Sequence, residues 1–260
     1  DVCSSDLIKP VLGSSFLVLA FFLSFGFQNR TFNTSHYPLE TPMLEQGDVY
    51  VKHTGYAFVY NEVHEQAKWV AYCLTKKEAL GTFERSDHFI EDPSVQTGTA
   101  TNADYAKSGY DRGHLAPAAD MRWSESAMDE SFFYSNMSPQ LPAFNRGIWK
   151  KLEEQVRDWA LAMDSILIVT GPILTESLPT IGVNKVSVPK YYYKAILDFK
   201  GTHSKAIAFV MPNQGSKEPL MNFAISIDAL EKLTGINFFY QLDDSLEQDI
   251  EAKACQTCWP

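Results

Sequence analysis

The side chains best suited to chemistry lie in one short segment, YDRGHLAP, which runs from Tyr110 to Pro117. It contains Arg112 and His114. A histidine with a pKa of about 6.5 can accept a proton from water near neutral pH, and an arginine presents a planar fork that matches phosphate oxygens. Alone, the segment also fits an ordinary turn, because Asp and Gly favour turns. Its neighbours along the chain decide between these interpretations.

A second polar pattern begins 31 residues after His114, at Asn145. Trp149, Glu153 and Arg157 follow at steps of four. At 100° per residue, the path from Asn145 to Glu153 makes two turns plus about 80°. Asn145, Glu153 and Arg157 are therefore expected along one side of a single helix. Without the upstream segment, Glu153 and Arg157 would read as a surface pair worth about 0.2–0.5 kcal/mol.

Together these segments resemble the DNA/RNA non-specific endonucleases, the sugar-non-specific nucleases with a ββα-metal active site that include mitochondrial endonuclease G. The resemblance rests on DRGH followed by N-x3-W-x2-LE, and it covers most of the chain after residue 27. Further similar segments lie at 169–172, 188–189 and 230–235. The resemblance implies an α+β, ββα-metal nuclease fold with a central, mostly antiparallel sheet flanked by helices.

The resemblance also implies catalytic roles. His114 matches the family's general base, and Asn145 matches its single protein ligand to the metal. Glu153 resembles the acidic residue that orders the water around that metal. Arg157 resembles an arginine near the substrate phosphate.

Two more arginines and two supporting residues complete the implied site. Arg112, inside the motif, is expected to help bind phosphate. Arg85 is the other candidate, because it precedes an aromatic and Asp-Pro segment as in the family. Asn136 and Asp111 are expected to support the metal site without touching the metal.

The implied metal is Mg²⁺, with Mn²⁺ as a substitute. One neutral amide oxygen plus water suits Mg²⁺, which gives up its water reluctantly, and a coordinated water can assist the departing 3′ oxygen. Contacts confined to phosphate and sugar carry no sequence information, so low base specificity follows. Zinc is not favoured, because no ligand spacing joins the remaining histidines, which are His36, His53, His64, His88 and His203.

We therefore expect a metal-dependent endonuclease that cuts DNA and RNA to 5′-phosphate ends. Two alternatives stay open: a catalytically silent nuclease-like domain that binds phosphorylated ligands or a partner protein, and a hydrolase of smaller phosphodiesters. An inhibitor protein and a homodimer are further partners to test. The net charge of −10 excludes retention on nucleic acid by bulk positive charge, but a local basic cleft remains compatible with it.

Hydrophobic periodicity predicts one mixed domain, with strands next to strands favouring a largely antiparallel or mixed sheet. Strands are expected at 48–52, 56–60, 68–74, 165–174 (buried and central), 191–199, 205–211, 223–227 and 236–242. Helices are expected at 124–132, at 146–163 with Asn145 as N-cap, from 228 to a stop at Gly235, and after a cap at Asp244. Residues 81–110 are expected to form a long ordered loop, which is uncommon unless functional.

The N-terminal region predicts export. Residues 14–27 are apolar and follow Lys9; such a stretch is short for a membrane span of ~20 residues but fits a secretory signal. We expect residues 1–27 to be a signal peptide or N-terminal anchor, 28–47 an arm, and 48–260 the nuclease domain. The location is then secreted or periplasmic, or membrane-anchored through residues 14–27. The other interpretation of that stretch is a buried core helix.

The composition is that of a globular protein. The chain has 260 residues, of which 45% are hydrophobic and 21% charged, which excludes a disordered or fibrous chain. Cys255 and Cys258 form a C-x-x-C pair near the C-terminus. With no second pair for zinc and no thioredoxin-like context, we expect a local disulfide or a structural tail. Cys73 is expected to be buried in a strand.

Overall fold

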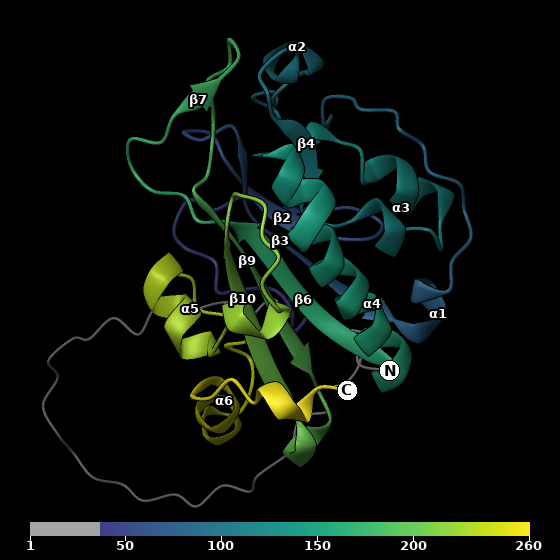
Figure 1. Cartoon of the computed structure of the whole chain (residues 1–260), viewed down its shortest axis with the longest axis vertical. Coiled ribbons are helices and arrows are strands. Elements are labelled where there is room, and N and C mark those ends of the chain that lie inside the picture. The colour runs from purple at the N-terminus through teal and green to yellow at the C-terminus, as the bar shows by residue number, and fades with distance from the viewer. Residues whose placement is uncertain (1–36) are drawn as a thin grey trace, which may run out of the picture.

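A seven-stranded antiparallel sheet forms the centre of the molecule (Figure 1), in the order β1-β2-β3-β6-β9-β10-β11. This computed structural model describes residues 37–260. The expected α+β class with a central antiparallel sheet is confirmed. The leader predicted at 1–27 and the first part of the arm predicted at 28–47 lie outside the described residues.

The strands of the central sheet are β1 (Tyr50–Lys52), β2 (Ala57–Asn61), β3 (Gln66–Thr75), β6 (Ser165–Pro172), β9 (Tyr191–Asp198), β10 (Lys205–Pro212) and β11 (Ala224–Ile225). Two separate hairpin-like pairs are β4 (Asp111–His114) with β5 (Met137–Gln140), and β7 (Thr180–Ile181) with β8 (Val186–Ser187). The continuous apolar run at 165–174 forms β6, the fourth of the seven strands, as predicted.

The α-helices are α1 (Lys76–Ala79), α2 (Asn102–Tyr105), α3 (Glu125–Glu130), α4 (Lys150–Met163), α5 (Ile227–Thr234) and α6 (Asp244–Glu251). Short 3₁₀ turns lie at Ala118–Asp120, Tyr134–Asn136, Gly201–His203, Leu220–Phe223 and Gln256–Cys258. Within residues 37–260, none of these helices combines the length and apolar character that crossing a membrane requires.

Helices cover both faces of the sheet. Leu152 and Val156 on α4 belong to the same buried cluster as Ile168 on β6. Leu230 on α5 belongs to a second cluster with Leu167, the neighbouring residue of β6. Because successive side chains of a strand point to opposite faces, burial on both faces explains why β6 reads as an unbroken apolar run.

The prediction of a strand at 236–242 is wrong. Ile236, Phe238, Phe239 and Leu242 are buried in the second cluster, but the segment is irregular and pairs with no described strand. Its apolar residues therefore reflect packing beside α5 rather than sheet pairing. The strand predicted at 223–227 shrinks to the two residues of β11, because a 3₁₀ turn precedes it and Ser226 caps α5.

The long helix begins later than predicted, at Lys150. Residues Phe144–Trp149 form the π-helical segment η3, in which Gly147 has non-helical dihedral angles of φ −110° and ψ −110°. Asn145 therefore lies inside a wide turn and is not the N-cap. The register calculated from Asn145 to Glu153 fails for the same reason, since a π-helical turn does not advance by 100° per residue.

The shorter helices match the sequence signals more closely. Ser124 caps α3, and its side chain accepts a hydrogen bond from the Ala127 amide. Gly235 ends α5 with φ +71°, a left-handed conformation that glycine adopts without steric cost. Asp243, one residue before the predicted cap, occupies the N-cap of α6.

The C-terminal tail is closed by a disulfide between Cys255 and Cys258, which confirms the predicted local pairing. Trp259 beside it packs against Trp159 of α4, with ring centres 4.6 Å apart. Cys73 is half-buried rather than buried, and no described cysteine is a free thiol.

Candidate active site

The strand pair β4–β5 carries the predicted motif and is fixed to the main sheet. Ser138 of β5 donates a hydrogen bond to Gln66 Oε1 (2.6 Å) and lies 2.7 Å from the Tyr192 hydroxyl. Gly113 must be glycine, because a Cβ there would lie 2.2 Å from the Gln140 side chain. The DRGH segment is thus a rigid strand and not the turn that its composition also allows.

Alternation along β4 separates the motif into two faces. Arg112 and His114 share one face, where the Arg112 guanidinium lies 3.9 Å from the centre of the Phe89 ring. The His114 ring meets Phe89 and Phe132 edge to face, at 5.9 and 4.8 Å between centres. Asp111 points to the other face.

Asp111 organises the π-helical segment. Its carboxylate accepts a hydrogen bond from Asn145 Nδ2 (2.9 Å) and two from Arg146, at 2.8 Å from Nε and 2.6 Å from Nη2. Burial acts to raise the pKa of Asp111, but the hydrogen bonds from Arg146 and Asn145 outweigh it and hold the pKa below its usual value. The carboxylate is therefore charged, and it orients the Asn145 amide through the hydrogen bond to Nδ2.

A cleft of about 350 Å³ opens between the long loop, β4 and η3. Arg85, Arg112, Asn145 and Arg146 are among its lining residues. The structure therefore brings together the predicted metal ligand and two of the three arginines predicted near phosphate, from three separate segments. His114, Glu153 and Arg157 do not line this cleft.

His114 lies behind the wall of the cleft, next to Phe89, which does line it. Its Nε2 atom is buried and has no hydrogen-bond partner among the described residues. Burial, reinforced by the positive charges of Arg85 and Arg112, lowers the pKa of His114 to about 3. The ring is therefore neutral over a wider pH range than the ordinary value of 6.5 predicts, and in this environment it is a weaker base than a free imidazole.

Arg157 and Glu153 belong to a charged cluster beneath α4. Arg157 Nη1 donates to Asp120 Oδ1 (2.7 Å), and the Tyr72 hydroxyl donates to Asp120 Oδ2 (2.7 Å). Arg157 is thus engaged with a buried carboxylate. The sequence placed it near phosphate and gave no role to Asp120 or Tyr72.

Lys194 is the cationic residue that sequence reasoning missed. It is fully buried on β9, with Nζ 5.1 Å from the centre of the Trp149 ring and no hydrogen-bond partner among the described residues. Burial lowers the pKa of Lys194 and raises that of Glu153, and each charge opposes the shift of the other. The available signal was a single lysine in the apolar run YYYKAILD.

Asn136 supports a different part of the site from the one expected. Its Oδ1 accepts from the Ala116 amide (2.9 Å), and its Nδ2 donates to the carbonyls of Ala116 (2.9 Å) and Ser131 (2.8 Å). It is fully buried. These bonds hold the chain just after His114 and make no contact with the Asn145 amide.

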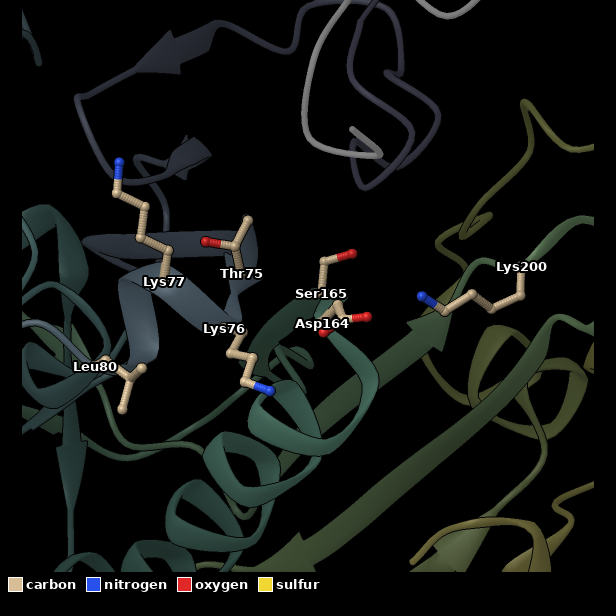
Figure 2. Close-up of a pocket in the computed structure, with 7 residues that line it drawn as sticks. All are labelled: Thr75, Lys76, Lys77, Leu80, Asp164, Ser165 and Lys200. Carbon is tan, nitrogen blue, oxygen red and sulfur yellow. The ribbon is translucent and has the colours of Figure 1, made fainter.

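A larger hollow, of about 620 Å³, lies away from this site (Figure 2) and holds none of the predicted residues. Lys76 and Lys200 extend toward Asp164 from opposite sides of it. Lys200 Nζ donates to the Met163 carbonyl (2.9 Å), and so is already occupied. Size alone does not identify the reactive centre of this molecule.

The Asn145 side chain suits a hard divalent cation. With Nδ2 bonded to Asp111, its Oδ1 has no hydrogen-bond partner among residues 37–260 and lies in a cleft open to water. A neutral oxygen ligand combined with several waters is the coordination that Mg²⁺ favours. The residues present therefore fit the implied metal.

Known proteins share both the sequence and the fold. The family model for DNA/RNA non-specific endonucleases matches residues 38–245. The zebrafish (Danio rerio) mitochondrial nuclease EXOG is 36% identical over 222 residues, 78% of this chain and 65% of that protein. Nuclease C1 of Cunninghamella echinulata var. echinulata is 36% identical over 85% of this chain and 96% of that protein. Human mitochondrial endonuclease G is 37% identical over 70% of this chain and 67% of that protein.

A solved structure of the EndoG/EndoGI complex superimposes with a TM-score of 0.72 and 32% identity, covering 79% of this chain and 90% of that one. A ββα-metal nuclease architecture is thus the class that fold and site define. The chain belongs to the DNA/RNA non-specific endonuclease family. The expected enzyme class, an endonuclease, is confirmed at the level of the family. The chain spans 57–67% of the length of the animal EXOG and endonuclease G relatives and 96% of Nuclease C1.

Proposed function

We propose that this protein is a divalent-metal-dependent endonuclease that hydrolyses phosphodiester bonds of DNA and RNA with little sequence specificity. The observation that carries the proposal is the convergence of Arg85, Arg112 and Asn145 on one cleft, in a chain of this family. The arginines bind the phosphate through its oxygens and leave the bases unread.

His114 acts as the general base in this proposal. Its lowered pKa keeps the ring unprotonated at neutral pH, and Nε2 is the buried nitrogen, so Nδ1 is the atom offered to water. Phe89 must yield part of its contact with the ring for substrate and water to reach it. A bound phosphate between Arg85 and Arg112 offsets their charges, which makes the imidazole more basic when substrate is present.

Asn145 would hold Mg²⁺, or Mn²⁺ in its place, through Oδ1. The bound cation would neutralise phosphate charge and stabilise the leaving oxygen. Asp111 positions the amide through the hydrogen bond to Nδ2. Glu153, whose charge interacts with those of Lys194 and Arg157, would order the water around the metal, while the Arg157 side chain is engaged by Asp120.

The decisive test is cleavage of plasmid and of RNA by the purified chain with MgCl₂, MnCl₂ or EDTA. His114→Ala and Asn145→Ala are each expected to lose about 10²–10⁴ of the rate, the range for general acid–base groups. His203→Ala is the matched control, because His203 is exposed on a remote turn. A wild-type chain that binds oligonucleotides but cuts neither polymer with either metal would instead be the silent nuclease-like domain.

A dinucleotide substrate separates polymer cleavage from hydrolysis of smaller phosphodiesters. Three arginines along the cleft favour a polymer, because adjacent phosphates can engage Arg85, Arg112 and Arg146 together. We expect the rate constant kcat/KM to be much lower for the dinucleotide. Equal values for both substrates would favour the smaller ones.

Export and inhibition are proposed on separate grounds. The apolar stretch at 14–27 supports secretion or periplasmic location, tested by cell fractionation and N-terminal sequencing of the mature chain. The structural likeness to EndoG bound to EndoGI supports a protein inhibitor, tested by titrating EndoGI against plasmid cleavage. A homodimer is tested by sedimentation of the purified chain.

A further inference from the structure

A second group of acidic side chains gathers where α5 meets α6 (Figure 1), against the sheet face opposite to α4. Asp228 and Glu231 lie three residues apart on α5 and therefore on one side of that helix. Glu251 is the last residue of α6. One carboxylate oxygen from each lies within 4.8 Å of the others.

Glu251 distinguishes this group from an ordinary acidic surface. Its side chain is only 3% exposed, and its Oε1 is buried with no hydrogen-bond partner among the described residues. Burying a carboxylate without a partner is strongly unfavourable, so such a group takes up a proton or a cation. A buried carboxyl group with an unpartnered oxygen, and with two further carboxylates within 4.8 Å, needs positive charge if it is to be ionised.

Among the described residues, no positive charge is found to act on Glu251. Burial raises its pKa to about 9, and the charges of Glu231, Glu247 and Asp228 act in the same direction. Lys232 acts on Glu231, but its side chain is exposed. Glu231 is also fixed in place, because its Oε1 accepts a hydrogen bond from the Phe238 amide (2.8 Å).

We propose that Asp228, Glu231 and Glu251 form a binding site for Ca²⁺ that ties the end of α6 to α5. Their oxygens lie within 4.8 Å of one another, which is no farther than two ligands on opposite sides of an ion with Ca–O distances of about 2.4 Å. Asp228 and Glu231 are half-exposed, so water completes the six to eight ligands that Ca²⁺ takes. Mg²⁺ fits less well, since it requires ligands at about 2.0–2.1 Å in a strict octahedron.

A proton would neutralise Glu251 alone and leave the other carboxylates facing one another. A divalent cation satisfies all three at once, which is why the geometry favours it. The site lies across the sheet from Asn145 and shares no residue with the cleft. Its role is therefore structural, and its failure would leave the proposed nuclease activity untouched.

The test is thermal unfolding of the full chain carrying Asn145→Ala, which removes the candidate catalytic ligand, after treatment with EGTA. Adding CaCl₂ up to about 10 mM, above the affinity range of extracellular sites, is expected to raise the midpoint by about 5 °C or more. MgCl₂ at the same concentration should give a smaller rise. No Ca²⁺-dependent rise in this parent would overturn the proposal.

Glu251→Gln in the same background is expected to abolish the response to Ca²⁺. Asp249→Asn is the matched control, because Asp249 lies on α6 but is exposed, and it should keep the full response. Should Glu251→Gln fail to fold, the half-exposed Asp228→Asn replaces it. An unchanged rise in these site variants would locate the ion elsewhere and refute the assignment.

Discussion

Two glutamates on opposite faces of the sheet, the half-buried Glu153 and the buried Glu251, meet opposite surroundings. Glu153 on α4 faces Lys194 and Arg157, whose positive charges act against the burial that raises its pKa. Glu251 on α6 faces three carboxylates, whose charges add to the effect of burial. The difference shows that burial alone does not fix the state of a carboxyl group; its charged neighbours do.

The contrast also separates two uses of a buried charge. Around Glu153, the positive charges of Lys194 and Arg157 oppose the negative charges of Asp120 and Glu154, so the protein itself supplies cations that favour the ionised carboxylate. Around Glu251 the protein leaves the balance open, and an ion from solution must close it. We test this contrast with variants of these groups, in order of decreasing expected effect.

The largest effect is expected on removing Lys194. Lys194→Met removes the buried cation whose charge favours the ionised form of the half-buried Glu153, and should destabilise the fold by up to about 3 kcal/mol. Urea unfolding at pH 8 measures it. The double variant Glu153→Gln/Lys194→Met should recover most of the loss, because no unpaired charge then remains. If Lys194→Met is as stable as the double variant, the charges of Glu153 and Lys194 do not interact in the folded protein.

The next effect concerns Glu251 in the absence of metal. Its folded pKa of about 9 exceeds the ordinary value of 4.5, so between these two pH values the native state holds a proton that the unfolded chain releases. Stability due to this group is therefore complete below about pH 4.5 and is lost as the pH rises toward 9.

Glu251→Gln is expected to remove this loss of stability at high pH, because the amide does not titrate. In EGTA at pH 7–8 the variant should be more stable than the wild type by about 2 kcal/mol, a discounted share of the roughly 1.4 kcal/mol per pH unit that linkage allows. At pH 4 the two should agree closely. Urea unfolding of both proteins at both pH values measures the difference. If the stability of the two proteins changes with pH in the same way, Glu251 is not the group that titrates.

A tenfold effect is expected in the pH dependence of cleavage. The pKa of Glu153 is raised to about 7, while that of His114 is lowered to about 3, so the acid limb of kcat/KM belongs to Glu153. The rate should fall about tenfold per pH unit below that value. Glu153→Gln should flatten the limb in the residual activity, whereas Glu251→Gln should leave it in place.

The smallest effect is expected at a surface pair that serves as the reference. Lys150 and Glu154 lie 3.5 Å apart on α4, with both side chains more than half exposed. Glu154→Gln should change the free energy of unfolding by less than about 0.5 kcal/mol, because solvent screens such pairs. A loss comparable to that of Lys194→Met would remove the distinction between buried and exposed charges.

Much of the fold follows from local signals in the sequence. The apolar run of β6 indicates a strand that is covered on both faces, and Gly235 indicates the end of α5. Residues 236–242 mislead because an alternating apolar segment can also cover a helix–sheet junction without pairing. Periodicity reports which side chains are buried and is silent on which backbone groups are paired.

The site was predictable in its residues more than in its geometry. Spacing and resemblance identified Asn145, Arg112 and Arg85, which the fold brings to one cleft. They could not reveal the π-helical segment, since non-helical angles at Gly147 leave no trace in hydrophobic spacing. They also could not predict that Lys194 is a buried cation, because this depends on the Trp149 ring lying over its side chain in the folded protein.

The π-helical segment also makes the enzyme sensitive to the length of its chain. Losing one residue between Phe144 and Trp149 would let α4 continue backward with ordinary α-helical spacing, turning Asn145 by about 100° away from Asp111. Leu152 and Trp159 would stay in the core, so the protein would still fold. We therefore expect a single codon deletion at this point to leave a folded protein in which Asn145 no longer faces Asp111.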